Sequence, residues 1–192
     1  MEKAEKPKAE EDLEDKLIRE EEEDNNYAVS IEWTAIEESI ATPLLITGSA
    51  GNPSAFLKIL FGDSGAEQIG TSKSKVFDRR KHEEKEEDVA TIHRSKDGLI
   101  YVLPEGGCTS SITNEFVERL MQKIKPARVL LLDSVFKTKY RTIDYLSEAN
   151  FLRSVVTSKE ARKAMQAFAP AMDSHNFVRG LSASFLNYGE IN

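Results

Sequence analysis

Residues 112–132 read ITNEFVERLMQKIKPARVLLL. The apolar side chains of the first half recur at the spacing of one helical stripe: Ile112, Phe116, Val117, Leu120, Met121 and Ile124. Ser111 can cap this helix and Pro126 ends it. Val129–Leu132 is an apolar run typical of a central strand that is covered on both faces. A helix, a short turn and a buried strand in this order predict an α/β fold.

Upstream, two further strands and a helix are predicted. Tyr27, Val29, Ile31 and Trp33 alternate with smaller or polar residues, which indicates a strand with one buried face. The apolar run 43–47, closed by Gly48, indicates a more central strand. Asn52 and Pro53 then predict the N-cap and first turn of a helix that ends at Gly62. Its apolar residues are Phe56, Leu57, Leu60 and Phe61.

The middle of the chain combines a charged segment with a hairpin. Residues 64–88 are rich in Gly and Ser and then in mixed charges, which predicts a long exposed loop. The runs 89–93 and 99–103 flank Asp97 and Gly98, the strongest turn signal in the chain, and predict a β-hairpin.

The last third is predicted to hold two helices after an irregular stretch at 134–149. One helix, continuous or interrupted, is expected over 151–168, and Pro170 separates it from a final helix. That helix carries Phe177, Val178, Leu181, Phe185 and Leu186 along one side. Phe177 and Phe185 are expected in the core, with a place in an interface as the alternative. Together the segments predict an α/β/α sandwich, a mixed sheet of about five strands with helices on its faces.

Composition divides the chain into a tail and one domain. Residues 1–26 are strongly acidic and have only Leu13, Leu17 and Ile18 as large apolar groups, so they are expected to be a disordered tail. A transient amphipathic helix, or an acidic arm that touches a basic partner, is the alternative. Residues 27–192 are expected to form a single α/β domain.

The net charge of −7 argues against nucleic acid or an anionic membrane as the main partner. A basic protein surface is the more natural partner. Cys108 is the single cysteine, which favours a reducing compartment, and no stretch of about twenty apolar residues is present. We therefore expect a cytoplasmic protein, with the nucleus as a second possible location.

One loop suggests a ligand site. Gly48, Ser49, Ala50 and Gly51 lie between a predicted strand and a predicted helix, where backbone amides can hold a phosphate. The loop lacks the Lys and Ser/Thr of a P-loop and does not complete a G-x-G-x-x-G pattern. A tight turn that requires glycine torsions is the simpler interpretation, and a nucleotide- or phosphate-binding protein is the alternative function.

No catalytic or metal-binding set is predicted. Cys108 precedes a helix, but none of His82, His93 and His175 is tied to it by sequence. The serines of 180–184 approach G-x-S-x-G but lie within a helical pattern. The basic run 79–81 has no aromatic residues interleaved with it and is followed by acidic residues, and no zinc or calcium spacing is present. We therefore expect a binding protein without cofactors and not an enzyme.

Three blocks in the last third are familiar in their order and spacing. They read DSVFKT at Asp133–Thr138, NFLRSVVT at Asn150–Thr157 and NFVRGLSASFLNY at Asn176–Tyr188. Together they resemble the proteasome assembly chaperone 1 family. Ile46, Gly48 and the segment 55–57 also look like that family's early strand and helix, so the resemblance covers residues 27–188.

The resemblance implies a chaperone that assists assembly of the 20S proteasome α-ring. It would act as a heterodimer with a second, proteasome assembly chaperone 2-like protein and would contact proteasome α-subunits. The family continues with a further strand and helices and ends in a hydrophobic residue, a tyrosine and one last residue, whereas here Tyr188 is followed by Gly, Glu, Ile and Asn. The expectation is therefore a member without the family's C-terminal part, or one that docks on the ring differently.

Overall fold

The computed structural model describes residues 28–62, 65–78, 83–106, 108, 112–136, 139–141, 152–174 and 176–191. The tail predicted for residues 1–26 lies outside the described residues.

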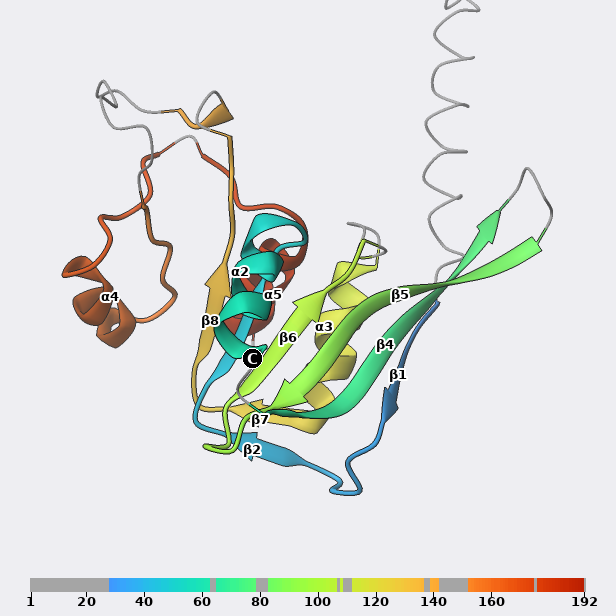
Figure 1. Ribbon diagram of the computed structural model, residues 1–192. Helices are drawn as coiled ribbons and strands as arrows, with labels where there is room; N and C mark the ends of the chain where they lie inside the picture. Colours follow the sequence, from blue (N-terminus) through green and yellow to red (C-terminus); the bar gives the residue numbers. More distant parts are fainter. Residues whose placement is uncertain are drawn as a thin grey trace, which may run out of the picture.

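A mixed six-stranded sheet forms the centre of the fold (Figure 1). Its order is β1 (Ala28–Trp33), β4 (Glu67–Asp78), β5 (Glu83–Arg94), β6 (Ile100–Pro104), β3 (Leu45–Gly48) and β8 (Val129–Leu132). The first four of these strands pair antiparallel, and β3 runs parallel to both β6 and β8. Two short strands, β2 (Ile40–Thr42) and β7 (Ile124–Pro126), form a separate parallel pair. The predicted α/β class with a mixed sheet is confirmed, with six strands in the main sheet where about five were expected.

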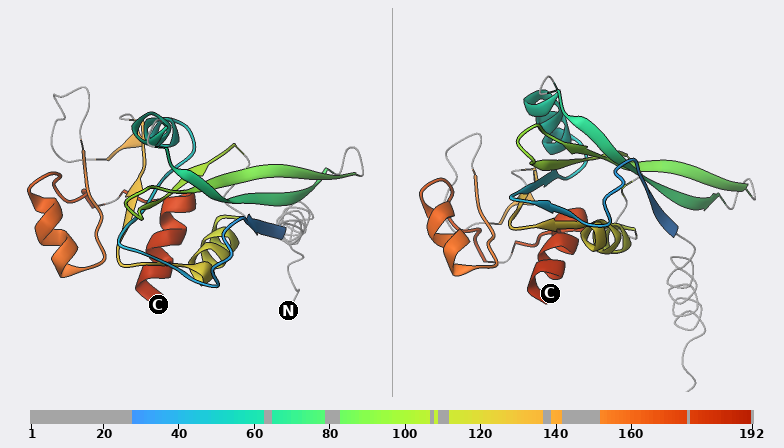
Figure 2. Two further views of the ribbon diagram at one scale, coloured as in Figure 1. Left: turned by 60° about the horizontal axis from the view of Figure 1, so that its bottom comes forward. Right: turned by 90° about the horizontal axis from the view of Figure 1, so that it is seen from below.

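Helices cover both faces of the sheet (Figure 2). Helix α2 (Asn52–Phe61) lies on one face, and α3 (Thr113–Lys123) and α5 (Gly180–Ile191) lie on the other. The larger core lies under α3 and α5, and a smaller one lies under α2. Successive strand residues alternate between them: Leu45 enters the larger core and Ile46 the smaller.

The helix predicted from the opening stretch is present as α3. Phe116, Val117 and Leu120 are buried along one side, and Met121 packs against them. The helix ends at Lys123, and Ile124 is extended. Lys125, the residue before Pro126, is likewise disfavoured from helical torsions, so the helix does not resume. Ile112 takes the N-cap position without a side-chain cap, and Ser111 lies outside the described residues.

The exposed loop predicted for residues 64–88 is wrong. Residues 67–78 and 83–94 instead form the long β4–β5 hairpin. Its register places Lys73 opposite Asp88 and Lys75 opposite Glu86, so charges that suggested a loop face each other across two strands. Ser72 and Ser74 occupy buried positions where apolar residues would have signalled a strand. The hairpin extends beyond the rest of the sheet (Figure 1).

The position predicted for Val129–Leu132 is also wrong. As β8 these residues form the last strand of the sheet and pair only with β3 among the described strands. Val129 and Leu130 are exposed, and Leu131 and Leu132 are only partly buried. All four residues of the strand are apolar, which suggested a central position, but the strand is not covered on both faces.

The last third differs from the predicted pair of helices. Helix α4 is shorter than expected, Lys159–Gln166, and Ser158 caps it by accepting a hydrogen bond from the Ala161 amide. The final helix begins only at Gly180, so Phe177 precedes it and is 77% exposed, not in the core. Phe185 is buried as predicted.

Two local predictions hold with small changes. The hairpin of β5 and β6 turns at Gly98, whose φ of 78° is the left-handed conformation that glycine favours. Helix α2 has Pro53 in its first turn, as expected. Its N-cap, however, is Gly51 and not Asn52, which belongs to the helix.

Candidate protein-binding surface

The predicted anion loop connects β3 to α2, and backbone donors at its start and in the first turn of α2 are engaged within the fold. Ser49 N–H donates to Leu132 C=O over 2.9 Å, and Ser54 N–H donates to Ser49 C=O over 3.2 Å. Ala55 N–H donates to Gly51 C=O, and Pro53 has no N–H. The helix cation Lys58 pairs with Glu105, 3.0 Å away. The geometry favours the structural turn, while ligand binding at Gly48–Gly51 stays a prediction.

The glycine at the start of this loop has a packing reason. A Cβ added at Gly48 would lie 2.7 Å from Pro53 Cβ and 3.3 Å from Leu132 C=O. The close approach of helix to strand therefore requires glycine here. Gly51 serves a different need, since its φ is 97°.

Cys108 is not arranged as a nucleophile. Burial raises the pKa of its thiol to about 11, so almost no thiolate forms near neutral pH. Its side chain packs against the larger core, under α3 and α5. His93 instead stacks on Tyr101, a residue of the smaller core under α2, with ring centroids 5.0 Å apart. The two side chains therefore belong to different faces of the sheet, and His82 and His175 lie outside the described residues.

His93 has a structural setting. Its Nε2 lies 3.0 Å from Thr91 Oγ1, and burial lowers the pKa of its imidazole. Phe61 of α2 also stacks on Tyr101, with ring centroids 4.7 Å apart. The stack joins α2 to the sheet.

The serines of residues 180–184 lie within α5 and not on a strand-to-helix turn. Ser182 and Ser184 are buried, and Ser184 Oγ donates to Thr113 Oγ1 over 2.8 Å. This hydrogen bond joins α5 to α3. No group of three or more metal-binding side chains comes together in the described residues. None of the helices in the described ranges has both the length and the apolar character that crossing a bilayer requires.

The unusual surface begins on α2, which is apolar on two sides. Leu57 is fully buried against the sheet, and Ser54 Oγ donates to Pro104 C=O to hold the helix in place. Phe56, Ile59 and Leu60 are exposed, and Ile59 is 83% exposed. A surface helix ordinarily presents polar residues to water.

The rotation of α2 shows where this exposed side lies. Lys58 reaches Glu105, which follows β6, so its side of the helix faces away from β8. Phe56 and Leu60 are each two positions from Lys58, which is about 160° around an α-helix. They therefore lie on the side of α2 nearer to β8.

Strand β8 continues the apolar surface. Leu130 pairs with Ile46, whose side chain lies under α2, so Leu130 is on the α2 face of the sheet. Val129 lies on the opposite face, and both side chains are exposed. We refer to Phe56, Ile59, Leu60 and Leu130, together with the outer edge of β8, as the α2–β8 surface.

The outer edge of β8 also presents main-chain groups. Arg128 C=O and Leu132 C=O accept hydrogen bonds from Leu45 and Ser49, so these positions point toward β3. Alternation along a strand directs the N–H and C=O of Val129 and Leu131 outward. The other edge strand, β1, differs because Ser30 and Glu32 are exposed along it. An apolar edge strand beside an apolar helix is an arrangement that another protein can extend.

Sequence reasoning placed no site here. The signal was present in α2, where NPSAFLKILF has only Asn52, Ser54 and Lys58 as polar residues. The pattern alone does not say which side is packed.

No family model matches the sequence, and no curated protein matches it.

The three blocks that carry the resemblance are placed around this edge of the fold. The first directly follows β8 and has Val135 and Phe136 exposed. Leu152 and Val155 of the second block are exposed as well, while the third extends into α5. Lys137, Thr138, Asn150 and Phe151 lie outside the described residues.

Proposed function

We propose that this chain is a non-catalytic assembly chaperone subunit that binds other proteins through the α2–β8 surface. The observation that carries the proposal is the exposed apolar side of α2 next to the apolar outer edge of β8, which pairs with no further strand among the described residues. Exposed apolar patches of this kind mark interaction sites in soluble domains.

The resemblance supports a more specific proposal. The partners would be a second, proteasome assembly chaperone 2-like protein and the α-subunits of the 20S proteasome, whose ring the heterodimer would help to assemble in the cytoplasm. The heterodimer is the natural user of the α2–β8 surface, because a related α/β chain has a sheet edge of its own to add to β8.

Co-purification of the tagged full-length chain from its own cells tests the identity of the partners. We expect recovery of α-subunits together with a second chaperone of the same class. Recovery of neither would contradict the assembly role. Recovery of a different protein, with saturable binding, would support the α2–β8 surface as a binding site but contradict the role in proteasome assembly.

Substitutions on α2 test the surface itself. Ile59→Ser combined with Leu60→Ser should weaken capture of the second chaperone by more than about tenfold, since truncation of a central apolar contact costs about 1–2 kcal/mol or more. Ile36→Ser is the matched control, because Ile36 is 99% exposed but lies in the β1–β2 connection. Equal capture by the double variant and the control would exclude α2 from the interface.

A pair of proline variants tests strand addition at β8. Val129→Pro removes an outward N–H and leaves the pairing with β3 intact, so we expect a folded chain with weakened capture. Leu130→Pro removes an N–H on the β3 side, so it should lower the stability of the fold. Unchanged capture by a folded Val129→Pro variant would show that no partner strand pairs with this edge.

A further inference from the structure

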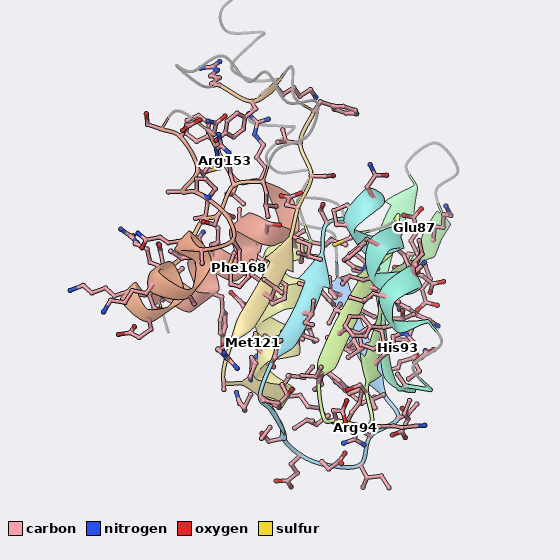
Figure 3. All side chains as sticks on the ribbon, turned by 60° about the vertical axis from the view of Figure 1, so that its left-hand side comes forward. Glu87, His93, Arg94, Met121, Arg153 and Phe168 are labelled. Carbon is pink, nitrogen blue, oxygen red and sulfur yellow. The ribbon has the colours of Figure 1, made fainter. Side chains whose placement is uncertain are left out.

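The segment between β8 and α5 forms an arm that stands outside the sheet. The arm comprises the described residues of 139–179, and its helix α4 has no buried residue. Figures 1 and 2 show α4 beyond β8, at the opposite end of the sheet from β1. Figure 3 places Arg153 and Phe168 on the arm, far from Glu87 of the β4–β5 hairpin.

The arm is held together by its own hydrogen bonds. Ser154 N–H donates to Pro170 C=O over 2.8 Å, and Met172 N–H donates to Ser154 C=O over 2.9 Å. Asn176 links its two ends, since it accepts from the Arg141 amide over 2.7 Å and donates to the Arg141 C=O over 2.6 Å. The arm is therefore a defined structure that does not depend on α4 packing against the sheet.

The arm concentrates positive charge in an acidic protein. Its described residues include seven cations against the two carboxylates of Glu160 and Asp173, a net charge of +5. With residues 142–151 included, 139–179 still has seven cations against four carboxylates. The cations are Lys139, Arg141, Arg153, Lys159, Arg162, Lys163 and Arg179.

Apolar side chains are exposed among these cations. Phe168 and Phe177 are each 77% exposed, and Leu152 and Val155 are exposed as well. Such a mixture suits a protein segment that is both acidic and apolar better than it suits a phosphate backbone, which offers no aliphatic side chains.

The chain contains a segment of the complementary chemistry. Residues 10–18 read EEDLEDKLI, with five carboxylates against one lysine, and Leu13, Leu17 and Ile18 recur at helical spacing. We propose that residues 10–18 of this chain bind intramolecularly to the basic arm, with the carboxylates facing the cations of α4 and the leucines facing Phe168.

The length of the connection decides which acidic residues can reach the arm. Six strands about 4.8 Å apart separate β1 from β8 by about 24 Å across the sheet. The register also sets Ala28 about 15 Å farther along the strands than Leu132, so the two residues lie about 28 Å apart. Residue 18 is ten positions before β1, which allows about 33 Å at about 3.3 Å per residue. Asp24 is four positions before β1 and can reach only about 13 Å. Asp24 therefore cannot reach β8, whereas the connection to residues 10–18 is long enough.

A spin label on the full-length chain tests the proposal. A nitroxide at Ala9→Cys should broaden the amide resonances of 152–174 and not those of the β5–β6 turn. Cys108 reacts slowly because burial raises the pKa of its thiol to about 11. The broadening should be lost in about 1 M salt, where the Debye length is about 3 Å.

Charge-reversal variants give the contrast. Arg162→Glu with Lys163→Glu should restore the arm resonances to full intensity, and neither side chain is buried, so the fold is retained. Lys96→Glu with Lys125→Glu changes the net charge equally at exposed positions outside the arm and should leave the broadening unchanged. Absence of broadening in the parent, or its persistence after reversal on α4, would overturn the proposal. Broadening seen only when labelled and unlabelled chains are mixed would also overturn the intramolecular form.

Discussion

Replacement of Gly48 by alanine measures how much the close packing between β3 and α2 contributes to the free energy of unfolding. The added Cβ would lie 2.7 Å from Pro53 Cβ and 3.1 Å from the Pro53 carbonyl carbon. Both atoms belong to a rigid ring residue in the first turn of α2, so neither can rotate away. The helix must shift on the sheet, and overpacking of this kind costs about 1–3 kcal/mol.

The expected fall in the melting temperature follows from the length of the chain. At about 2–4 °C per kcal/mol for a protein of this size, Gly48→Ala should melt about 2–12 °C below the parent. Urea unfolding can be followed by the fluorescence of Trp33, the single tryptophan. An unchanged dependence on urea would show that the variant unfolds from the same native state.

Two other glycines separate steric from torsional effects. Gly106 has open space at its Cβ position, so Gly106→Ala should change the free energy of unfolding by less than about 0.5 kcal/mol. Gly51 also has open space, but its φ of 97° and ψ of −129° are sparsely populated by residues with a Cβ, so Gly51→Ala should cost about 1–3 kcal/mol through torsional strain alone. If Gly48→Ala were as stable as Gly106→Ala, the close approach of α2 to β3 would not explain this glycine.

Four further outcomes are expected. Burial lowers the pKa of His93 from its ordinary 6.5, so below pH 6.5 the unfolded chain binds a proton more readily than the folded chain does. The free energy of unfolding should therefore fall as the pH drops below 6.5. Urea unfolding of His93→Gln should show a weaker pH dependence. The pKa of the Cys108 thiol is raised from 9.0 to about 11, so iodoacetamide should label the folded chain about a hundredfold more slowly than the unfolded chain by mass spectrometry. The same shift favours the protonated folded state, so stability should decline as pH rises from 9.0 toward about 11, and Cys108→Ala should remove that decline. Nucleotides and inorganic phosphate should leave the melting temperature unchanged, whereas a ligand at a hundred times its Kd would add about 2.7 kcal/mol and would restore the Gly48–Gly51 loop as a binding site.

The sequence predicted those elements that depend on neighbouring residues. The stripe of α3 and the turn at Gly98 follow from the helical period and from glycine torsions, which act within a few residues. The α/β class followed from the same local patterns. The acidic composition of the first 26 residues is likewise visible in the sequence alone.

The β4–β5 hairpin and the α2–β8 surface depended on contacts between distant residues. Lys73 lies opposite Asp88 only once the two strands have paired. A charged segment without alternating apolar residues does not predict that pairing. Sequence identified Val129–Leu132 as a strand but not as an edge, because strand order is set by which neighbours pack and hydrogen-bond.

There is a physical reason why some features were predictable from the sequence and others only from the tertiary structure. Local torsional preferences and periodicity specify which residues form a helix or a strand, and composition indicates how much apolar surface must be buried. Which apolar side chains remain exposed is decided by how the layers fit together. Helix α2 is apolar on two sides, and only its placement over β3 and β6 buries Leu57 and leaves Phe56, Ile59 and Leu60 exposed beside the outer edge of β8.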